Sequence, residues 1–166
     1  MAGLAAAIGL PVVVILTWIS ATARPDLFDL VPAESHSDGY VMLAWGALER
    51  DHHALNAGEI ASGTRIRAIG YMMESKRPRR SGERVQDFVL LPDVGNAWHA
   101  HRFGDEMIDV QLDPGNAVPF AEKSLVWVWG TLRMLPGDPT GQEPLYVLEH
   151  ARSQPAGQED VRKYFR

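Results

Sequence analysis

The chain has 166 residues, 46% of them hydrophobic, which suffices for one domain with a substantial core. It contains no cysteine, which excludes a disulfide framework, a thiolate metal site and a cysteine nucleophile. The formal net charge of -5 argues against a nucleic-acid partner, because phosphates attract basic surfaces.

The N-terminal segment, residues 1–23, predicts insertion into a membrane. No charged side chain occurs between Ala2 and Ala23, and about 20 apolar residues are enough to cross a bilayer as a helix. The small residues Ala21-Thr22-Ala23 fit a signal-peptide cleavage site, whereas the long apolar run without a preceding Lys or Arg fits a retained anchor. We expect a transmembrane anchor or a cleaved signal here, followed by a Pro-, Asp- and Ser-rich linker over residues 24–39.

The rest of the chain predicts short strands separated by turns. The segment from Tyr40 is dense in apolar residues and is expected to form an ordered first element that packs Trp45 and Leu48. Residues 64–73 alternate between two faces, as a half-buried strand does. Four more strands are predicted from their apolar content and the turn residues between them, over residues 85–91, 106–112, 124–133 and 145–150.

This pattern leaves little room for helix and predicts a mainly β fold. The favoured architecture is a small, partly open OB-like β-barrel over residues 40–152. The polar tail, residues 153–166, is expected to be frayed or weakly helical.

The loop between the second and third predicted strands carries His99 and His101. Because residues i and i+2 of an extended segment share a face, both imidazoles can reach one ion. With Asp105 as a carboxylate partner, or Asp93 or Asp109 in its place, they form a ligand set suited to zinc or copper. The alternatives are structural hydrogen bonding or plain exposure of the rings, and acid/base catalysis.

A basic loop projects from this acidic chain. Residues 74–84 contain five basic and two acidic side chains. Arg77, Arg79 and Arg80 are candidates for contact with anionic lipid headgroups, and the alternative is a solvated hairpin tip.

A tryptophan pair, Trp127 and Trp129, falls on one face of a predicted strand. It could form an aromatic platform for a partner, or pack in the core or against a membrane. No serine elbow, zincin helix or phosphate-cradling glycine loop occurs in the chain, so we expect binding rather than catalysis.

Five short motifs are spread over residues 40–151: Trp45-x-x-Leu48, Gly70-Tyr71-Met72, Phe88-Val89-Leu90-Leu91-Pro92-Asp93-Val94-Gly95, His99, and Val126-Trp127-Val128-Trp129-Gly130-Thr131-Leu132. Together they resemble the bacterial family called domain of unknown function 3299. Members of that family are typically exported with an N-terminal signal, and some are encoded beside ABC-type permease components linked to metal supply. The resemblance implies a periplasmic position and an association with envelope transport or metal handling. It implies no established activity.

The chain departs from the family pattern in the histidine loop. Family members usually show a glycine turn, a Cys-x-His and a proline-rich run, whereas this chain has Ala97-Trp98-His99. A site built from a thiolate and an imidazole therefore cannot form here in the same way, and His101 is the residue that could replace the missing ligand. Glu74 also stands where the family's Gly-Tyr-x-x-Pro pattern has its proline.

We therefore expect a periplasmic module, membrane-anchored or secreted, that binds rather than transforms its partner. In the leading hypothesis it is an accessory protein of an envelope transport or metal-handling system, with a membrane-embedded partner such as an ABC-type permease and with a divalent metal held by His99 and His101. In the alternative it is a purely structural subunit that docks on a membrane protein complex or membrane surface. A third hypothesis is a hydrolase that uses His99 as a base.

Overall fold

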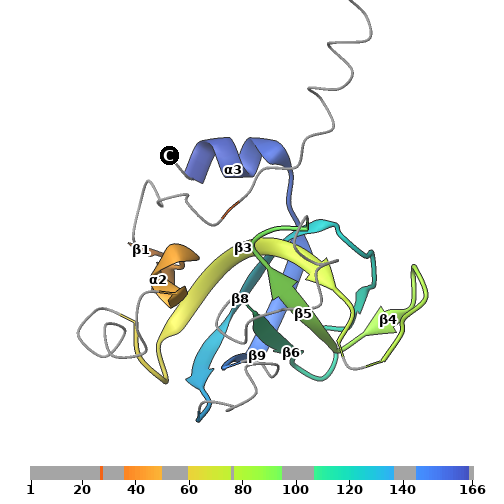
Figure 1. Cartoon of the computed structure of the whole chain (residues 1–166), viewed down its shortest axis with the longest axis horizontal. Coiled ribbons are helices and arrows are strands. Elements are labelled where there is room, and N and C mark those ends of the chain that lie inside the picture. The colour runs from red at the N-terminus through yellow and green to blue at the C-terminus, as the bar shows by residue number, and fades with distance from the viewer. Residues whose placement is uncertain are drawn as a thin grey trace, which may run out of the picture.

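The computed structural model describes residues 27, 36–49, 60–75, 77–94, 107–136 and 145–164. These residues are mainly β (Figure 1). The strands are β1 His36–Ser37, β2 Tyr40–Met42, β3 Arg65–Met73, β4 Arg84–Val85, β5 Asp87–Leu91, β6 Ile108–Leu112, β7 Val118–Pro119, β8 Leu125–Met134 and β9 Tyr146–Pro155. Two short helices, α2 Gly46–Glu49 and α3 Gln158–Tyr164, are also described.

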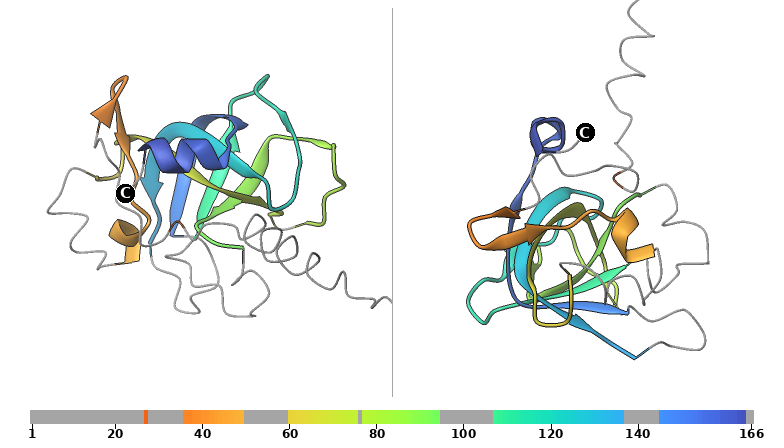
Figure 2. Two further views of the ribbon diagram at one scale, coloured as in Figure 1. Left: turned by 90° about the horizontal axis from the view of Figure 1, so that it is seen from above. Right: turned by 90° about the vertical axis from the view of Figure 1, so that its left-hand side faces the viewer.

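Five of the strands form a closed barrel in the order β3-β5-β6-β9-β8, because β8 also pairs with β3. The pairing of β6 with β9 is parallel, and the other four pairings are antiparallel. The right-hand view of Figure 2 shows the strands as a ring with α3 outside it. The expectation of a partly open barrel is wrong. β3 is nine residues long, so it pairs with β8 from Arg65 to Tyr71 and with β5 from Tyr71 to Met73.

The outer face of β3 is covered. Residues 64–73 predicted a half-buried strand, but every residue of β3 after Arg65 is buried. Figure 1 shows α3 lying over β3, and the helix contributes the buried Val161 to the core. The alternation of the strand is therefore real, but its second face is covered: Arg67 meets Tyr164 of α3, and Met73 packs with Val89, Leu91 and Met107.

A bulge explains why β9 is longer than the strand predicted over residues 145–150. Trp129 pairs with Arg152 and Thr131 pairs with Glu149, so two residues of β9 lie opposite Gly130. One of them, His150, has a φ of 51°. Such a bulge breaks the period of two by which a strand is recognised in a sequence. A side chain on Gly130 would meet the carbonyl oxygen of Glu149 at 2.8 Å, so glycine is required there.

The first element packs as expected. Trp45 and Leu48 are buried, and the indole Nε1 of Trp45 donates a hydrogen bond of 2.7 Å to the carbonyl of Ile69. The segment predicted as a linker also takes part in the fold, because β1 pairs with β2 and because Leu27 is buried in the core. Among the described residues, no helix has the length and hydropathy needed to cross a membrane. The apolar segment, residues 1–23, lies outside them.

Candidate functional site

The residues predicted to bind a metal, His99, His101 and Asp105, lie outside the described residues. The loop that carries them joins β5 to β6. These two strands pair with each other, from Asp87 opposite Gln111 to Leu90 opposite Ile108. Among the residues that the structure does describe, no three His, Asp or Glu side chains are grouped so as to hold a metal ion. The histidine site remains a prediction of the sequence.

The basic loop, residues 74–84, lies between β3 and β5 and is held by a buried arginine. The side chain of Arg79 is only 3% exposed. Its Nη2 lies 2.6 Å from Oδ2 of Asp87, and its Nη1 lies 3.3 Å from Oε1 of Glu83. The hydroxyl of Ser75 donates a hydrogen bond of 2.7 Å to the same Oδ2 of Asp87. Two carboxylates and a serine therefore fix the loop around one guanidinium.

This arrangement favours the charged form of all three ionisable groups. The hydrogen bond to Asp87 raises the pKa of Arg79 above its ordinary value. Burial raises the pKa of Asp87, but the hydrogen bonds from Ser75 and Arg79 outweigh it and leave that pKa below its usual value. The backbone N–H of Arg80, and then the guanidinium of Arg79, lower the pKa of Glu83. The ion pairs thus persist at neutral and mildly acidic pH.

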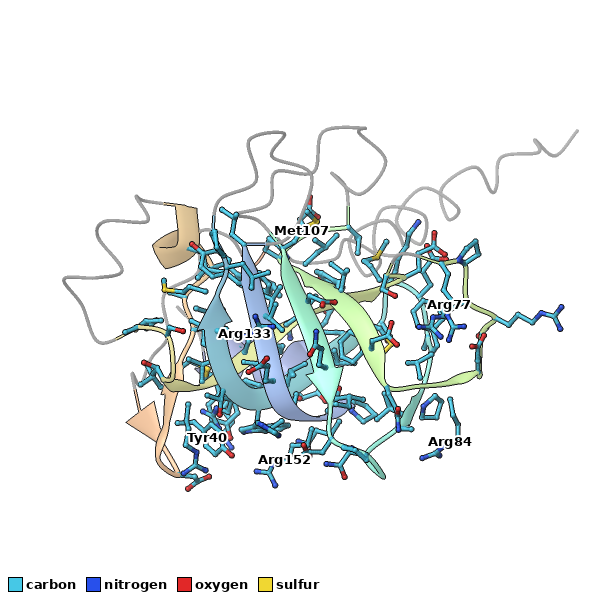
Figure 3. All side chains as sticks on the ribbon, turned by 90° about the horizontal axis from the view of Figure 1, so that it is seen from below. Tyr40, Arg77, Arg84, Met107, Arg133 and Arg152 are labelled. Carbon is cyan, nitrogen blue, oxygen red and sulfur yellow. The ribbon has the colours of Figure 1, made fainter. Side chains whose placement is uncertain are left out.

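The three arginines predicted in this loop therefore play different parts. Arg79 is enclosed and belongs to the internal structure of the loop, whereas Arg77 and Arg80 are exposed. Arg84, labelled with Arg77 in Figure 3, is also exposed and donates a hydrogen bond to the carbonyl of Ala117. Among the described residues, Arg77, Arg80 and Arg84 are thus the arginines of this loop that a membrane or partner could meet.

The predicted tryptophan pair lies at the centre of a second group, which we call the aromatic cluster: Arg67, Trp127, Trp129, Arg152 and Tyr164. Arg67 of β3, Trp129 of β8 and Arg152 of β9 are opposite one another across the three strands. In antiparallel strands, directly opposed residues point to the same face of the sheet. Tyr164 of α3, which lies outside the ring of strands in Figure 2, contacts Trp127, so this face is the outer one.

The rings of the aromatic cluster are in direct contact. The ring centroids of Trp127 and Trp129 are 5.9 Å apart, and those of Trp127 and Tyr164 are 5.4 Å apart at an interplanar angle of 87°. Trp127 is buried, whereas Trp129 is partly exposed and has the guanidinium carbon of Arg152 5.0 Å from its ring centroid. Trp129 and Arg152 are thus the exposed edge of the cluster. In Figure 3 Arg152 lies away from Arg77 and Arg84 and nearer Tyr40.

Arg67 is the buried cation of the cluster. It is 7% exposed, and its guanidinium carbon lies 5.0 Å from the ring centroids of both Trp127 and Tyr164. In the described part of the chain no carboxylate pairs with it, and its Nε and Nη2 are buried without a hydrogen-bond partner.

Two effects of opposite sign act on this guanidinium. A cation–π contact stabilises a desolvated cation by about 0.5–2 kcal/mol. A hydrogen bond left unmade by a buried donor costs about 1–3 kcal/mol, and more where the group is charged. Because two of its nitrogens lack hydrogen-bond partners, the two rings offset the cost of burying Arg67 only in part.

The sequence did not single out three members of the aromatic cluster. Arg67 follows the alternation of an exposed strand face, Arg152 lies beyond the bulge, and Tyr164 belongs to a tail expected to be frayed. One signal was present, since Arg67 shares its face with the apolar Ile69 and Tyr71. An arginine among apolar residues on a supposedly wet face indicates that the face is covered.

Comparisons with known proteins found similarity to a solved structure but not to a family model. No family model matches the chain, and no curated protein matches it. Among solved structures, the chain is similar to the crystal structure of a DUF3299 family protein from Pseudomonas aeruginosa PAO1, with 18% sequence identity and a TM-score of 0.45. The match covers 64% of this chain and 82% of that chain. The matched protein belongs to the family that the sequence motifs resemble.

Proposed function

We propose that the chain is a non-enzymatic binding module on the periplasmic side of the envelope, membrane-anchored or secreted, that docks on a membrane-embedded protein. The observation that carries this proposal is the partly exposed Trp129, which has the guanidinium of Arg152 over its ring and the buried Trp127 next to it on the same strand. Tryptophan and arginine dominate the energetically important positions of protein interfaces. A rigid aromatic platform of this kind loses little conformational entropy when a partner covers it.

The topology supports a binding role. The five barrel strands run in the order first-second-third-fifth-fourth, with the third and fifth parallel, so we assign the barrel to the OB type. OB barrels bind ligands through one strand face and through the loops after the first and fourth strands. The basic loop follows the first barrel strand, so Arg77 and Arg80 lie in one of those positions. Near an anionic leaflet each could contribute about 1 kcal/mol to membrane contact.

A second candidate function is metal binding. Two imidazoles and a carboxylate, supplied by His99, His101 and Asp105, suit zinc or copper, and the family resemblance associates such proteins with envelope transport and metal supply. Isothermal titration of the full chain with zinc and with copper tests this directly. Binding lost in the His99→Ala, His101→Ala double variant supports the assignment, and equally tight binding in that variant removes these ligands.

Co-purification from native membranes tests the docking proposal. A tagged full-length chain should retain a membrane protein partner, such as a transport permease, and should lose it in a Trp129→Ala, Arg152→Ala variant. Gln111→Ala, at an exposed position of β6, is the matched control and should retain the partner. Retention in both variants would contradict docking through this face. Release by a chelator alone would indicate that the partner depends on the metal.

A further inference from the structure

We propose that Arg67 is the anchor of a carboxylate-binding site on the outer face of the barrel. The proposal does not depend on the docking function, since it concerns the buried edge of the aromatic cluster rather than Trp129 and Arg152. It begins from the two nitrogen atoms that have no partner, Nε and Nη2 of Arg67.

These two atoms belong to the same edge of the guanidinium. Their N–H bonds run side by side, which is the spacing that the two oxygens of one carboxylate accept in a bidentate pair. A carboxylate is therefore the group that satisfies both donors and neutralises the charge at once. A single chloride ion or a water molecule offers one acceptor atom and matches this edge less well.

The rings around Arg67 define the rest of the site. Trp127 and Tyr164 meet nearly at right angles, 87°, and the guanidinium carbon is equally distant from both, at 5.0 Å. The cation thus sits in an aromatic corner that keeps water from its faces and strengthens a charged hydrogen bond at its edge.

A ligand reaches this edge only if one wall of the corner moves, because both nitrogens lie beneath the surface. Trp127 belongs to a ten-residue barrel strand paired on both sides, whereas Tyr164 belongs to a seven-residue helix with one buried residue, Val161. The helix is thus held less firmly than the strand. We therefore place the opening between α3 and β3.

Nitrogen-15 NMR of the full chain in detergent micelles tests the site, because a buried Arg Nε–H gives its own resonance. The Arg67 signal is assigned by its loss in Arg67→Met. Sodium acetate should shift it saturably, and sodium chloride at equal ionic strength should not. Arg79 is the matched internal control: its Nε also lacks a partner, but the Nη2 on the same edge already binds Asp87, so its signal should stay in place.

Succinate distinguishes the two sources of a carboxylate. An effect at tenfold lower concentration than acetate would identify a free dicarboxylate, and an equal effect would identify a single carboxylate such as an acidic side chain of a protein. A signal that acetate leaves unmoved, as a buried water at this edge would give, overturns the proposal. So does an equal shift with chloride.

The unfolding temperature of Arg67→Met gives a second test, which also shows whether Arg67 is needed for folding. The variant should unfold at the same temperature as the parent or higher, because an apolar side chain of similar length removes an unpaired buried charge. Acetate should raise the unfolding temperature of the parent and not that of the variant. A variant that fails to fold would show instead that Arg67 is needed for the structure, and would overturn its assignment as a ligand anchor.

Discussion

Two buried arginines on this barrel are held in opposite ways. Arg79, in the basic loop, has Glu83 and Asp87 as partners and leaves only its Nε without a hydrogen bond. Arg67, in the aromatic cluster, has two rings beside it and leaves two of its nitrogens without a partner. Both side chains are enclosed, so burial alone does not separate a structural arginine from a binding one.

The difference lies in where the counter-charge comes from. The carboxylates around Arg79 are supplied by the chain itself, four and eight residues further along, and they complete the loop. The charge of Arg67 is not matched by any described carboxylate of the chain, so a partner can supply it. Truncating the first arginine should therefore cost stability, and truncating the second should cost binding.

The largest expected effect on stability is that of Arg79→Met. It leaves Glu83 and Asp87 without their cation and should lower the free energy of unfolding by about 1.5 kcal/mol. This is below the value for a fully buried pair, because the two carboxylate side chains are 38% and 44% exposed and can be hydrated. Urea unfolding measures the loss, with the exposed Arg80→Met as control. Equal stability of the two variants would show that the ion pairs contribute nothing.

The same ion pairs predict a dependence on pH. The pKa values of Asp87 and Glu83 are lower in the folded chain than in the unfolded chain, so the unfolded chain binds more protons in acid. The contribution of these two carboxylates to stability is complete above the ordinary carboxylate pKa. It is lost as the pH falls through their lowered pKa values in the folded chain. Between pH 7 and about pH 3 the unfolding temperature of the parent should fall more than that of Arg79→Met. Parallel curves for the two proteins would contradict this account.

Ser75→Ala should have a smaller effect on the same loop. It removes one hydrogen bond to Asp87 but leaves the Arg79 ion pair in place, so a loss of about 0.7 kcal/mol is expected. Thermal unfolding of the single variant and of the double variant with Arg79→Met measures the coupling. The stability lost through Ser75→Ala should be smaller in the Arg79→Met background than in the parent, because both groups bind the same oxygen atom of Asp87. Strictly additive losses would show that the two contacts are independent.

The smallest effect on stability is expected at Arg67 itself. Arg67→Lys keeps the charge but loses the edge that bears two parallel N–H groups. The acetate effect on the unfolding temperature should therefore disappear, while the loss of stability stays smaller than that of Arg79→Met. A loss of stability comparable to that of Arg79→Met would place both arginines in the same structural class and remove the contrast between them.

The sequence predicted the positions of the barrel strands better than the closure of the barrel. β3, β5, β6 and β8 lie within about two residues of the expected ranges, because apolar content and turn residues are local signals. Closure between β3 and β8 joins residues some 60 positions apart, and no local pattern encodes it. The extension of β9 was missed for a different reason, since the bulge at His150 and Ala151 interrupts the alternation.

The candidate site was predicted only in part. Trp127 and Trp129 were placed correctly on one face, because the period of a strand determines that. The separation of Arg79 from Arg77 and Arg80 depends on Asp87 and Glu83 folding back over the loop, which charge counting cannot show. Arg67 gains its significance from α3, a helix distant in sequence that covers a face expected to meet water.

The most direct measurement of the central claim is site-specific photo-crosslinking in native membranes. A photoreactive amino acid at position 129, the exposed edge of the aromatic cluster, should form an adduct with a membrane protein. The same probe at position 111 on β6 should form none. An adduct at 129 alone is the result that we predict. The absence of any adduct at 129, or equal adducts at both positions, would contradict docking through the aromatic cluster.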